Sequence, residues 1–237
     1  MTNLIDLISQ YGAASWDKQE SLAALIGESE WQLRLRTGQI TFGGKHTFPV
    51  QVLGSEAQQS RTWLWGWANT ASGIAEHLLV ASRQMRTFGA QNNIREFTDS
   101  ELSLDTIDGH LLSLIASGVC HADCYYKGPY EGGAVFLLLT APQLKAHADD
   151  TALRFVRIFT TFISQFACDH RTALTAYANY KGYKCETRGS RVTCISPQGE
   201  PVRVEFDGEG RVAEMTSELI GASASSPAKQ PWWKFGK

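Results

Sequence analysis

The amino-acid sequence has no long apolar run and no cluster of lysine and arginine residues. Its longest apolar run, residues 134–139, has the length of a strand, whereas a membrane-spanning helix needs about 20 apolar residues. The formal net charge of the 237 residues is −2, and nucleic-acid-binding surfaces need a track of basic side chains. The sequence therefore predicts no transmembrane segment and no nucleic-acid partner.

Recognisable catalytic and cofactor motifs are also missing. There is no Gly-x-Ser-x-Gly nucleophile elbow, no phosphate-binding P-loop and no glycine-rich dinucleotide fingerprint. The two Gly-Gly pairs, at 43–44 and 132–133, fall in expected hairpin turns and do not precede helices. These patterns predict no cofactor.

The cysteines and histidines are poorly spaced for a metal site, because structural zinc needs four convergent ligands. Cys120 and Cys124 share one face of an expected strand, and His121 takes the other face. Cys168 and His170 diverge around an expected helix. The sequence predicts no bound metal and favours buried structural thiols.

The first residues show neither a basic leader nor an apolar signal core, which predicts a cytoplasmic protein with reduced cysteines. One pair of cysteines has an alternative. Gly189-Ser190 predicts a two-residue hairpin turn, which places Cys185 directly opposite Cys194. Opposed cysteines can form a disulfide, but the cytoplasmic prediction favours two thiols, with a redox pair as the alternative.

Apolar periodicity predicts an α+β fold in which antiparallel β-meanders pack against helices. The expected helices cover residues 4–12, 17–26, 72–88, 105–117 and 150–180, and Asp17 is the expected N-cap of the second. The expected strands cover residues 31–36, 39–42, 46–53, 119–126 and 134–140, a strand from about residue 62, and a C-terminal four-stranded meander at 183–215. The predicted domains are a main α+β domain at 1–180, a small β-meander at 181–220 and a flexible tail at 221–237.

Three tryptophans mark the strand from about residue 62. Trp63, Trp65 and Trp67 alternate with small or aliphatic residues, so a continuous strand would place all three indoles on one face. Two interpretations stay open: the indoles form core beneath the following helix, or they form the aromatic wall of a ligand groove.

The same stretch carries a resemblance. Gln51-x-Leu53-Gly54-Ser55 followed by Thr62-Trp-Leu-Trp-Gly-Trp-Ala-Asn69, with Trp31 upstream, resembles the signature of a bacterial family of proteins of unknown function. The likeness extends over roughly residues 10–180. It implies a bacterial, cytoplasmic protein, and it implies no activity, substrate or catalytic residue.

The C-terminus ends in a second aromatic group. Trp232, Trp233 and Phe235 follow a stretch rich in glycine, alanine and serine, and leaving them in water is costly. They are expected to dock on the protein itself, on a protein partner or dimer mate, or, with only two lysines in support, on a membrane surface.

We therefore predict a non-enzymatic binding protein that uses Trp63, Trp65, Trp67, Trp232, Trp233 and Phe235. The alternative is an enzyme whose site is assembled from distant polar residues such as His121, Asp123 and His170.

Overall fold

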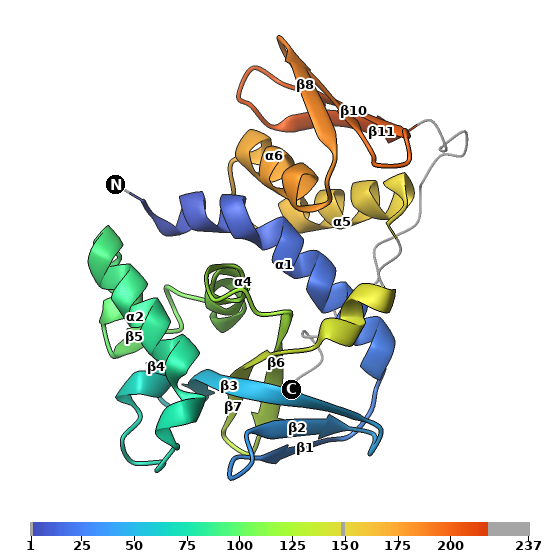
Figure 1. Cartoon of the computed structure of the whole chain (residues 1–237). Coiled ribbons are helices and arrows are strands. Elements are labelled where there is room, and N and C mark those ends of the chain that lie inside the picture. The colour runs from blue at the N-terminus through green and yellow to red at the C-terminus, as the bar shows by residue number, and fades with distance from the viewer. Residues whose placement is uncertain (1, 148–149, 218–237) are drawn as a thin grey trace. The chain divides into compact units, whose positions relative to one another are not determined.

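The computed structural model describes residues 2–147 and 150–217 (Figure 1). The helices of this part of the chain are α1 (Leu4–Ile26), α2 (Val80–Asn92), α3 (Arg95–Thr98), α4 (Gly109–Val119), α5 (Ala152–Gln165) and α6 (His170–Tyr180), with the 3-10 helices η1 (Gly66–Ala68), η2 (Glu76–Leu78) and η3 (Pro142–His147). Its strands are β1 (Trp31–Arg34), β2 (Gln39–Phe42), β3 (His46–Ala57), β4 (Thr62–Trp65), β5 (Glu101–Ser103), β6 (Cys124–Tyr130), β7 (Gly133–Leu139), β8 (Lys184–Arg188), β9 (Arg191–Ile195), β10 (Pro201–Phe206) and β11 (Val212–Ser217).

The predicted α+β class is confirmed, because all strand pairs in the described chain are antiparallel and helices accompany both sheets. The chain forms two compact units. Of the described residues, the first unit contains 2–4 and 18–147, and the second contains 5–17 and 150–217. Helix α1 therefore contributes to both units. No helix of the described residues has the length and apolar character needed to cross a membrane.

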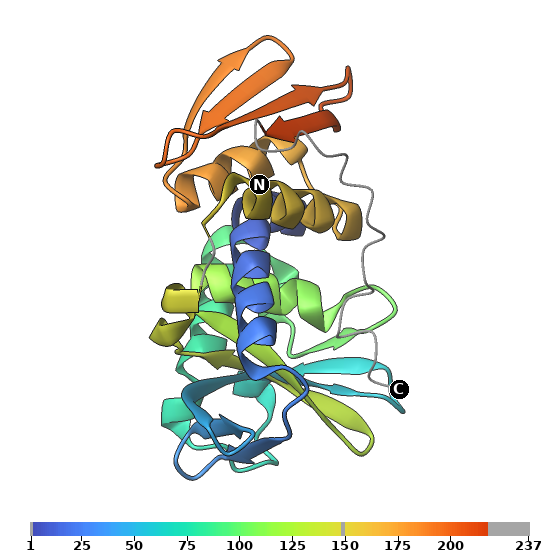
Figure 2. The ribbon, with the colours of Figure 1, turned by 90° about the vertical axis from the view of Figure 1, so that its right-hand side faces the viewer.

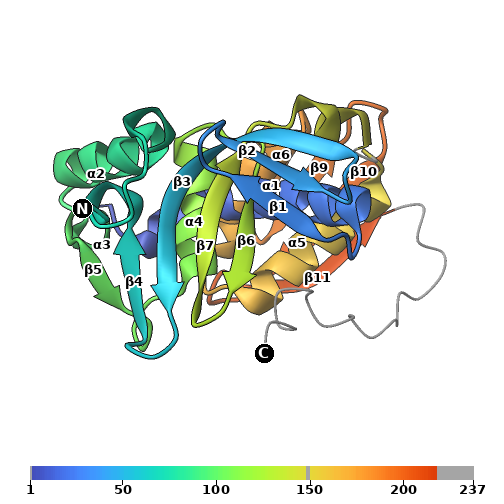
Figure 3. The same ribbon diagram turned by 90° about the horizontal axis from the view of Figure 1, so that it is seen from below.

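Strand β3 organises the first unit. Its first four residues pair with β2, residues 50–57 pair with β7 with a register shift at Leu53, and its last four residues also pair with β4. The sheet runs β1-β2-β3-β4-β5, and β7 and β6 continue it from β3. Figure 3 shows β1 and β2 lying across the β7–β6 hairpin. The long strand thus carries two parts of one sheet, which meet on a shared apolar core.

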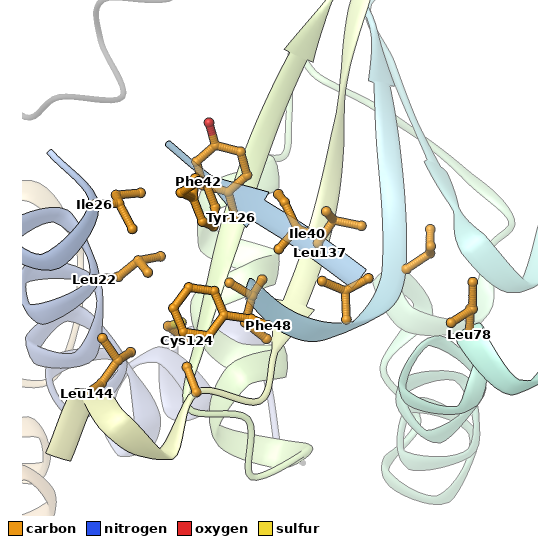
Figure 4. Packing of buried hydrophobic residues seen from close by; sticks show 14 of the residues in the cluster. Leu22, Ile26, Ile40, Phe42, Phe48, Leu78, Cys124, Tyr126, Leu137 and Leu144 are labelled. Atoms are coloured by element: carbon orange, nitrogen blue, oxygen red, sulfur yellow. The ribbon is translucent and has the colours of Figure 1, made fainter. Parts of the chain in front are cut away.

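This core contains side chains from α1, the first meander and the β6–β7 hairpin (Figure 4). The rings of Phe42 and Tyr126 are in edge contact, with centroids 4.7 Å apart, and Leu22 and Leu137 are fully buried. Burying a large apolar side chain contributes about 1.5–3 kcal/mol, so this cluster is the main force that holds the meander on the hairpin.

The prediction of two short helices near the N-terminus is wrong, because α1 is one continuous helix. Gly12 does not end this helix. A Cβ at Gly12 would lie 2.5 Å from the ring of Phe162 in α5, so the glycine lets α5 pack closely against the middle of α1. Asp17 is not an N-cap either. Its carboxylate accepts hydrogen bonds from Arg154 and Lys181 of the second unit's helical layer, and these partners favour a position in the helix interior.

Three further element boundaries differ from the prediction. The helix predicted from residue 72 begins at Val80, because the carbonyl oxygen of the Asn69 side chain accepts a hydrogen bond from the Ser72 N–H and stabilises a turn. Helix α4 begins after Asp108, whose carboxylate caps it at the His110 N–H. Because α4 continues to residue 119, strand β6 starts only at residue 124.

In the second unit, α5 and α6 lie along one face of the four-stranded sheet (Figure 2). The single helix predicted over 150–180 is wrong, because residues 166–169 interrupt it. Asp169 begins a new helix by accepting a hydrogen bond from the Thr172 N–H at 2.7 Å. The guanidinium of Arg171 then lies over the Phe206 ring, 4.2 Å from its centroid, and joins α6 to the sheet.

The predicted C-terminal meander is confirmed as the antiparallel sheet β11-β10-β9-β8. Its first hairpin has the predicted register, with Arg188 opposite Arg191 and Cys185 opposite Cys194. The prediction of two reduced thiols is wrong, because Cys185 and Cys194 form a disulfide. The register of the hairpin brings the two sulfurs together, whereas the prediction of two thiols rests on the expected cytoplasmic location.

The disulfide makes a direct prediction about thiol counts. Unfolded protein kept from reductant should expose three reactive thiols, those of Cys120, Cys124 and Cys168, and reduction should raise the number to five. Reduction should also lower the free energy of unfolding by about 2–4 kcal/mol, as is typical of a disulfide. Titration in urea with and without reductant measures both effects, and five thiols before reduction would contradict the disulfide.

Candidate binding groove

The tryptophan stretch does not form one continuous strand, so the prediction of three indoles on one face is wrong. Strand β4 ends at Trp65, and residues 66–68 form η1. Trp63 and Trp65 are fully buried. Trp63 contacts the ring of Phe136, and the Trp65 indole N–H donates to the Glu96 carbonyl at 2.9 Å. In the described structure these two indoles are core.

Trp67 has a different environment, because the chain turns at Gly66. A Cβ on Gly66 would lie 2.9 Å from the Val52 carbonyl oxygen, so only glycine lets η1 approach β3 this closely. The backbone N–H of Trp67 donates to the Ser82 hydroxyl, and the Arg86 guanidinium lies 4.3 Å from the centroid of its ring. Trp67 is half-buried and packs on α2.

A groove of about 400 Å³ lies beside this turn, entirely within the first unit. Strands β1, β3 and β7, the β6–β7 hairpin and the segment after β4 all contribute to it. Its lining residues are Trp31, Leu33, Leu35, Val52, Gly54, Ser55, Gly66, Asn69, Ser72, Ile74, Tyr130 and Val135. The volume lies within the range of ligand pockets, about 300–1,000 Å³.

Strand β1 forms the aromatic side of the groove. The Trp31 ring packs on Gly128, where a Cβ would lie 3.0 Å away, and it meets the Tyr126 ring edge-on at 5.9 Å. Leu35 and Tyr130 line the groove although their side chains are 41% and 51% exposed. The apolar lining therefore continues onto the accessible surface.

Polar side chains that bind the backbone hold the elements beside the groove. The Gln51 amide donates to the His77 carbonyl and accepts from the Ala81 N–H, which ties β3 to η2 and α2. The turn at Asn69 and Ser72 contributes two polar side chains to the lining, and Ser55 contributes a hydroxyl. A few polar groups among many apolar ones is the composition of a binding site.

Tyr130 is the titratable side chain in the described lining of the groove. Its lining residues, all within the described chain, include no carboxylate, histidine, lysine, arginine or cysteine. Such a surface can bury apolar groups and orient them with a hydroxyl or an amide.

Sequence reasoning missed a buried polar cluster on the face of the sheet covered by α4. The His110 imidazole and the Tyr125 hydroxyl are hydrogen-bonded at 2.9 Å, and Lys127 pairs with Glu56 at the same distance. Burial lowers the pKa of His110 to about 4, although the Asp108 carboxylate acts in the opposite direction. His110 is therefore neutral at pH 7, where it joins α4 to β6.

His110 predicts a loss of stability in acid. In the unfolded chain a histidine has a pKa near about 6.5, so between roughly pH 6.5 and pH 4 the unfolded state binds a proton that folded His110 does not. The free energy of unfolding should therefore fall by about 3 kcal/mol across this window and stay constant above it. Urea unfolding at pH 7, 5.5 and 4.5 tests this. His110→Gln should remove that part of the slope, and equal slopes would contradict the assignment.

The three residues of the enzyme alternative each have a local setting. His121, exposed and with φ of 53°, lies in the turn after α4, so it does not share a strand face with Asp123. The Asp123 carboxylate accepts a hydrogen bond from the Ala141 N–H at 2.7 Å. His170 belongs to the second unit, where its Nδ1 accepts from the Val212 N–H. Two of the three side chains thus hold backbone in place.

Among the described residues, no three His, Cys, Asp or Glu side chains gather as a metal site. Trp232, Trp233 and Phe235 lie outside the described residues.

Comparison with known proteins gives one match. The model of a family of unknown function (DUF6882) matches residues 5–142, a range that contains every lining residue of the groove. Neither the curated proteins nor the solved structures contain a significant match.

Proposed function

The chain belongs to this family of unknown function, and from its structure we propose that it is a non-enzymatic protein that binds an aromatic or apolar segment of a protein partner in the groove of the first unit. The observation that carries the proposal is the groove itself, with its apolar lining, its few polar groups and its exposed rim. An apolar surface rimmed by polar residues commonly marks an interaction site.

The groove suits inserted side chains of a peptide. Each large apolar side chain that enters it would gain about 1.5–3 kcal/mol from burial, and Trp31 and Tyr130 can make edge-to-face contacts with an aromatic ring. Because Leu35 and Tyr130 extend the apolar surface beyond the hollow, residues flanking the inserted side chains would also be covered.

The tryptophans of β4 support the groove from behind. A Cβ on Gly54 would lie 2.5 Å from the Trp63 ring, so Trp63 packs directly beneath this part of the groove floor. We therefore assign Trp63, Trp65 and Trp67 a positioning role in binding, and direct contact with the partner to Trp31, Leu35 and Tyr130.

We infer a bacterial source from the resemblance alone, and the cytoplasmic location stays a prediction. The Cys185–Cys194 disulfide argues against that location, because disulfides persist mainly in oxidising compartments. Native cells can be quenched with acid and the free thiols of the protein counted. Five thiols would support the cytoplasm, and three would support an oxidising compartment.

A peptide selection tests the proposed function. Random twelve-residue peptides are selected for binding to full-length protein in which Trp232, Trp233 and Phe235 are alanine, so that these side chains cannot compete. We expect peptides rich in aromatic residues, with binding weakened at least tenfold by the double variant Leu35→Asp, Tyr130→Asp. Leu35 and Tyr130 are 41% and 51% exposed and lie outside the buried core, so this variant should fold.

Val80→Asp is the matched control. Val80 is 59% exposed, lies at the start of α2 and does not line the groove, and an aspartate suits the N-terminus of a helix. Selected peptides should bind this variant as they bind its parent. Peptides that bind the parent and the double variant equally would contradict the proposed function.

A further inference from the structure

The groove and the C-terminus of the chain have complementary chemistry. Building on the proposed function, we propose that the groove is a receptor for the chain's own C-terminal segment, Pro231–Lys237, which a partner must displace in order to bind. The segment places three aromatic side chains within four residues, Trp232, Trp233 and Phe235. A groove with an exposed apolar rim is a described surface that suits such side chains.

The match is one of shape and polarity. A hollow of about 400 Å³ accommodates a few inserted side chains, and its opening through Leu35 and Tyr130 leaves room for the peptide backbone. Trp31 and Tyr130 offer ring edges and faces to an entering indole. The hydroxyls of Ser55 and Ser72 can accept a hydrogen bond from an indole N–H.

Charge contributes little to this recognition. Exposed Glu30 and Glu131 neighbour Trp31 and Tyr130 in the chain and would attract the two lysines of the segment. Exposed Arg34 and Arg36, on either side of Leu35, would repel them. Because both signs flank the groove, binding should depend on apolar burial and should weaken less than threefold between 50 and 500 mM salt.

The connection is long enough to place the segment far from β11. Residues 218–230 separate Ser217, the end of β11, from Pro231. Thirteen residues extend to at most about 45 Å. A segment carried on such a connection can occupy a binding surface and still be displaced by a partner of the same chemistry.

The test uses a labelled peptide with the sequence of residues 226–237, added to the full-length protein whose three tail aromatics are alanine. Fluorescence anisotropy should show saturable binding, weakened at least tenfold by Leu35→Asp, Tyr130→Asp and unchanged by Val80→Asp. The same peptide with alanine at Trp232 and Trp233 should not bind. Wild-type protein, whose groove its own segment occupies, should bind the labelled peptide at least tenfold more weakly than the tail variant.

Three outcomes would overturn the inference: equal binding to the tail variant and to its groove double variant, equal binding to wild type and tail variant, or no binding at 1 mM. The proposed function fails separately. If selected aromatic peptides bind the groove and the tail peptide does not, only the inference falls. If neither depends on Leu35 and Tyr130, the proposed function falls as well.

Discussion

Replacing Trp63 with alanine is expected to lower the free energy of unfolding of the first unit by about 3–5 kcal/mol, the usual cost of deleting a fully buried aromatic side chain. The Trp63 indole is inaccessible to solvent and packs between the rings of Trp65 and Phe136, with centroid distances of 5.4 and 5.0 Å. No hydrogen-bond partner for its N–H occurs in the described part of the chain, so the loss is one of packing.

Trp67→Ala is the matched comparison four residues later. Trp67 is half-buried and its ring is covered by Arg86, so we expect a loss of about 1 kcal/mol. Urea unfolding followed by circular dichroism measures both variants. Equal losses would show that the two tryptophans share one environment. The sequence predicts such a shared environment, whereas the structure places the two side chains in different ones.

Replacing Asp17 with alanine should destabilise the second unit by about 3–5 kcal/mol. The carboxylate is 5% exposed and pairs with Arg154 and Lys181, whose side chains are only 11% and 8% exposed. The Tyr177 hydroxyl donates to the same carboxylate at 3.1 Å. Lys181 also pairs with Asp150, so the main cost of removing the Asp17 anion is that the Arg154 guanidinium, which has little access to water, loses this carboxylate. Such a loss costs much more than the pair itself contributes.

An exposed ion pair provides the control. Arg61 and Asp105 pair in the first unit with side chains 65% and 63% exposed, so Asp105→Ala should cost at most about 1 kcal/mol. Hydrogen exchange followed by mass spectrometry locates the loss of stability, and the Asp17→Ala effect should appear in α5 and α6. A loss no larger than that of Asp105→Ala would contradict the role given to the buried network.

Local signals in the sequence predicted some elements well. Gly189-Ser190 specifies a tight turn, and this turn fixes the register that places Cys185 opposite Cys194. Local patterns gave wrong predictions at residues whose partners are distant in the sequence. Asp17 has the chemistry of an N-cap, but its partners are Arg154 and Lys181, more than 130 positions further along the chain. No local pattern reveals such partners.

The groove itself could not be predicted, because no single element forms it. Trp31, Gly54, Gly66 and Val135 come from four separate stretches that meet only because β3 pairs with β2, β7 and β4 along its length. A partial signal did exist. Trp31 and several residues between 51 and 69 carried the family resemblance, and they include five of the lining residues, Trp31, Gly54, Ser55, Gly66 and Asn69. Alternation along a strand pointed to the tryptophan side chains, whereas the accessible surface lies beside the glycines.

The most direct test of the groove uses ¹⁵N-labelled full-length protein in which Trp232, Trp233 and Phe235 are alanine. N-acetyl-tryptophanamide is titrated into this protein, and nuclear magnetic resonance follows the chemical shifts. A binding groove predicts saturable shifts confined to the Trp31 indole N–H and to the amides of Gly54, Ser55, Gly66 and Asn69. Shifts scattered over the surface, or gathered away from these residues, would contradict the account.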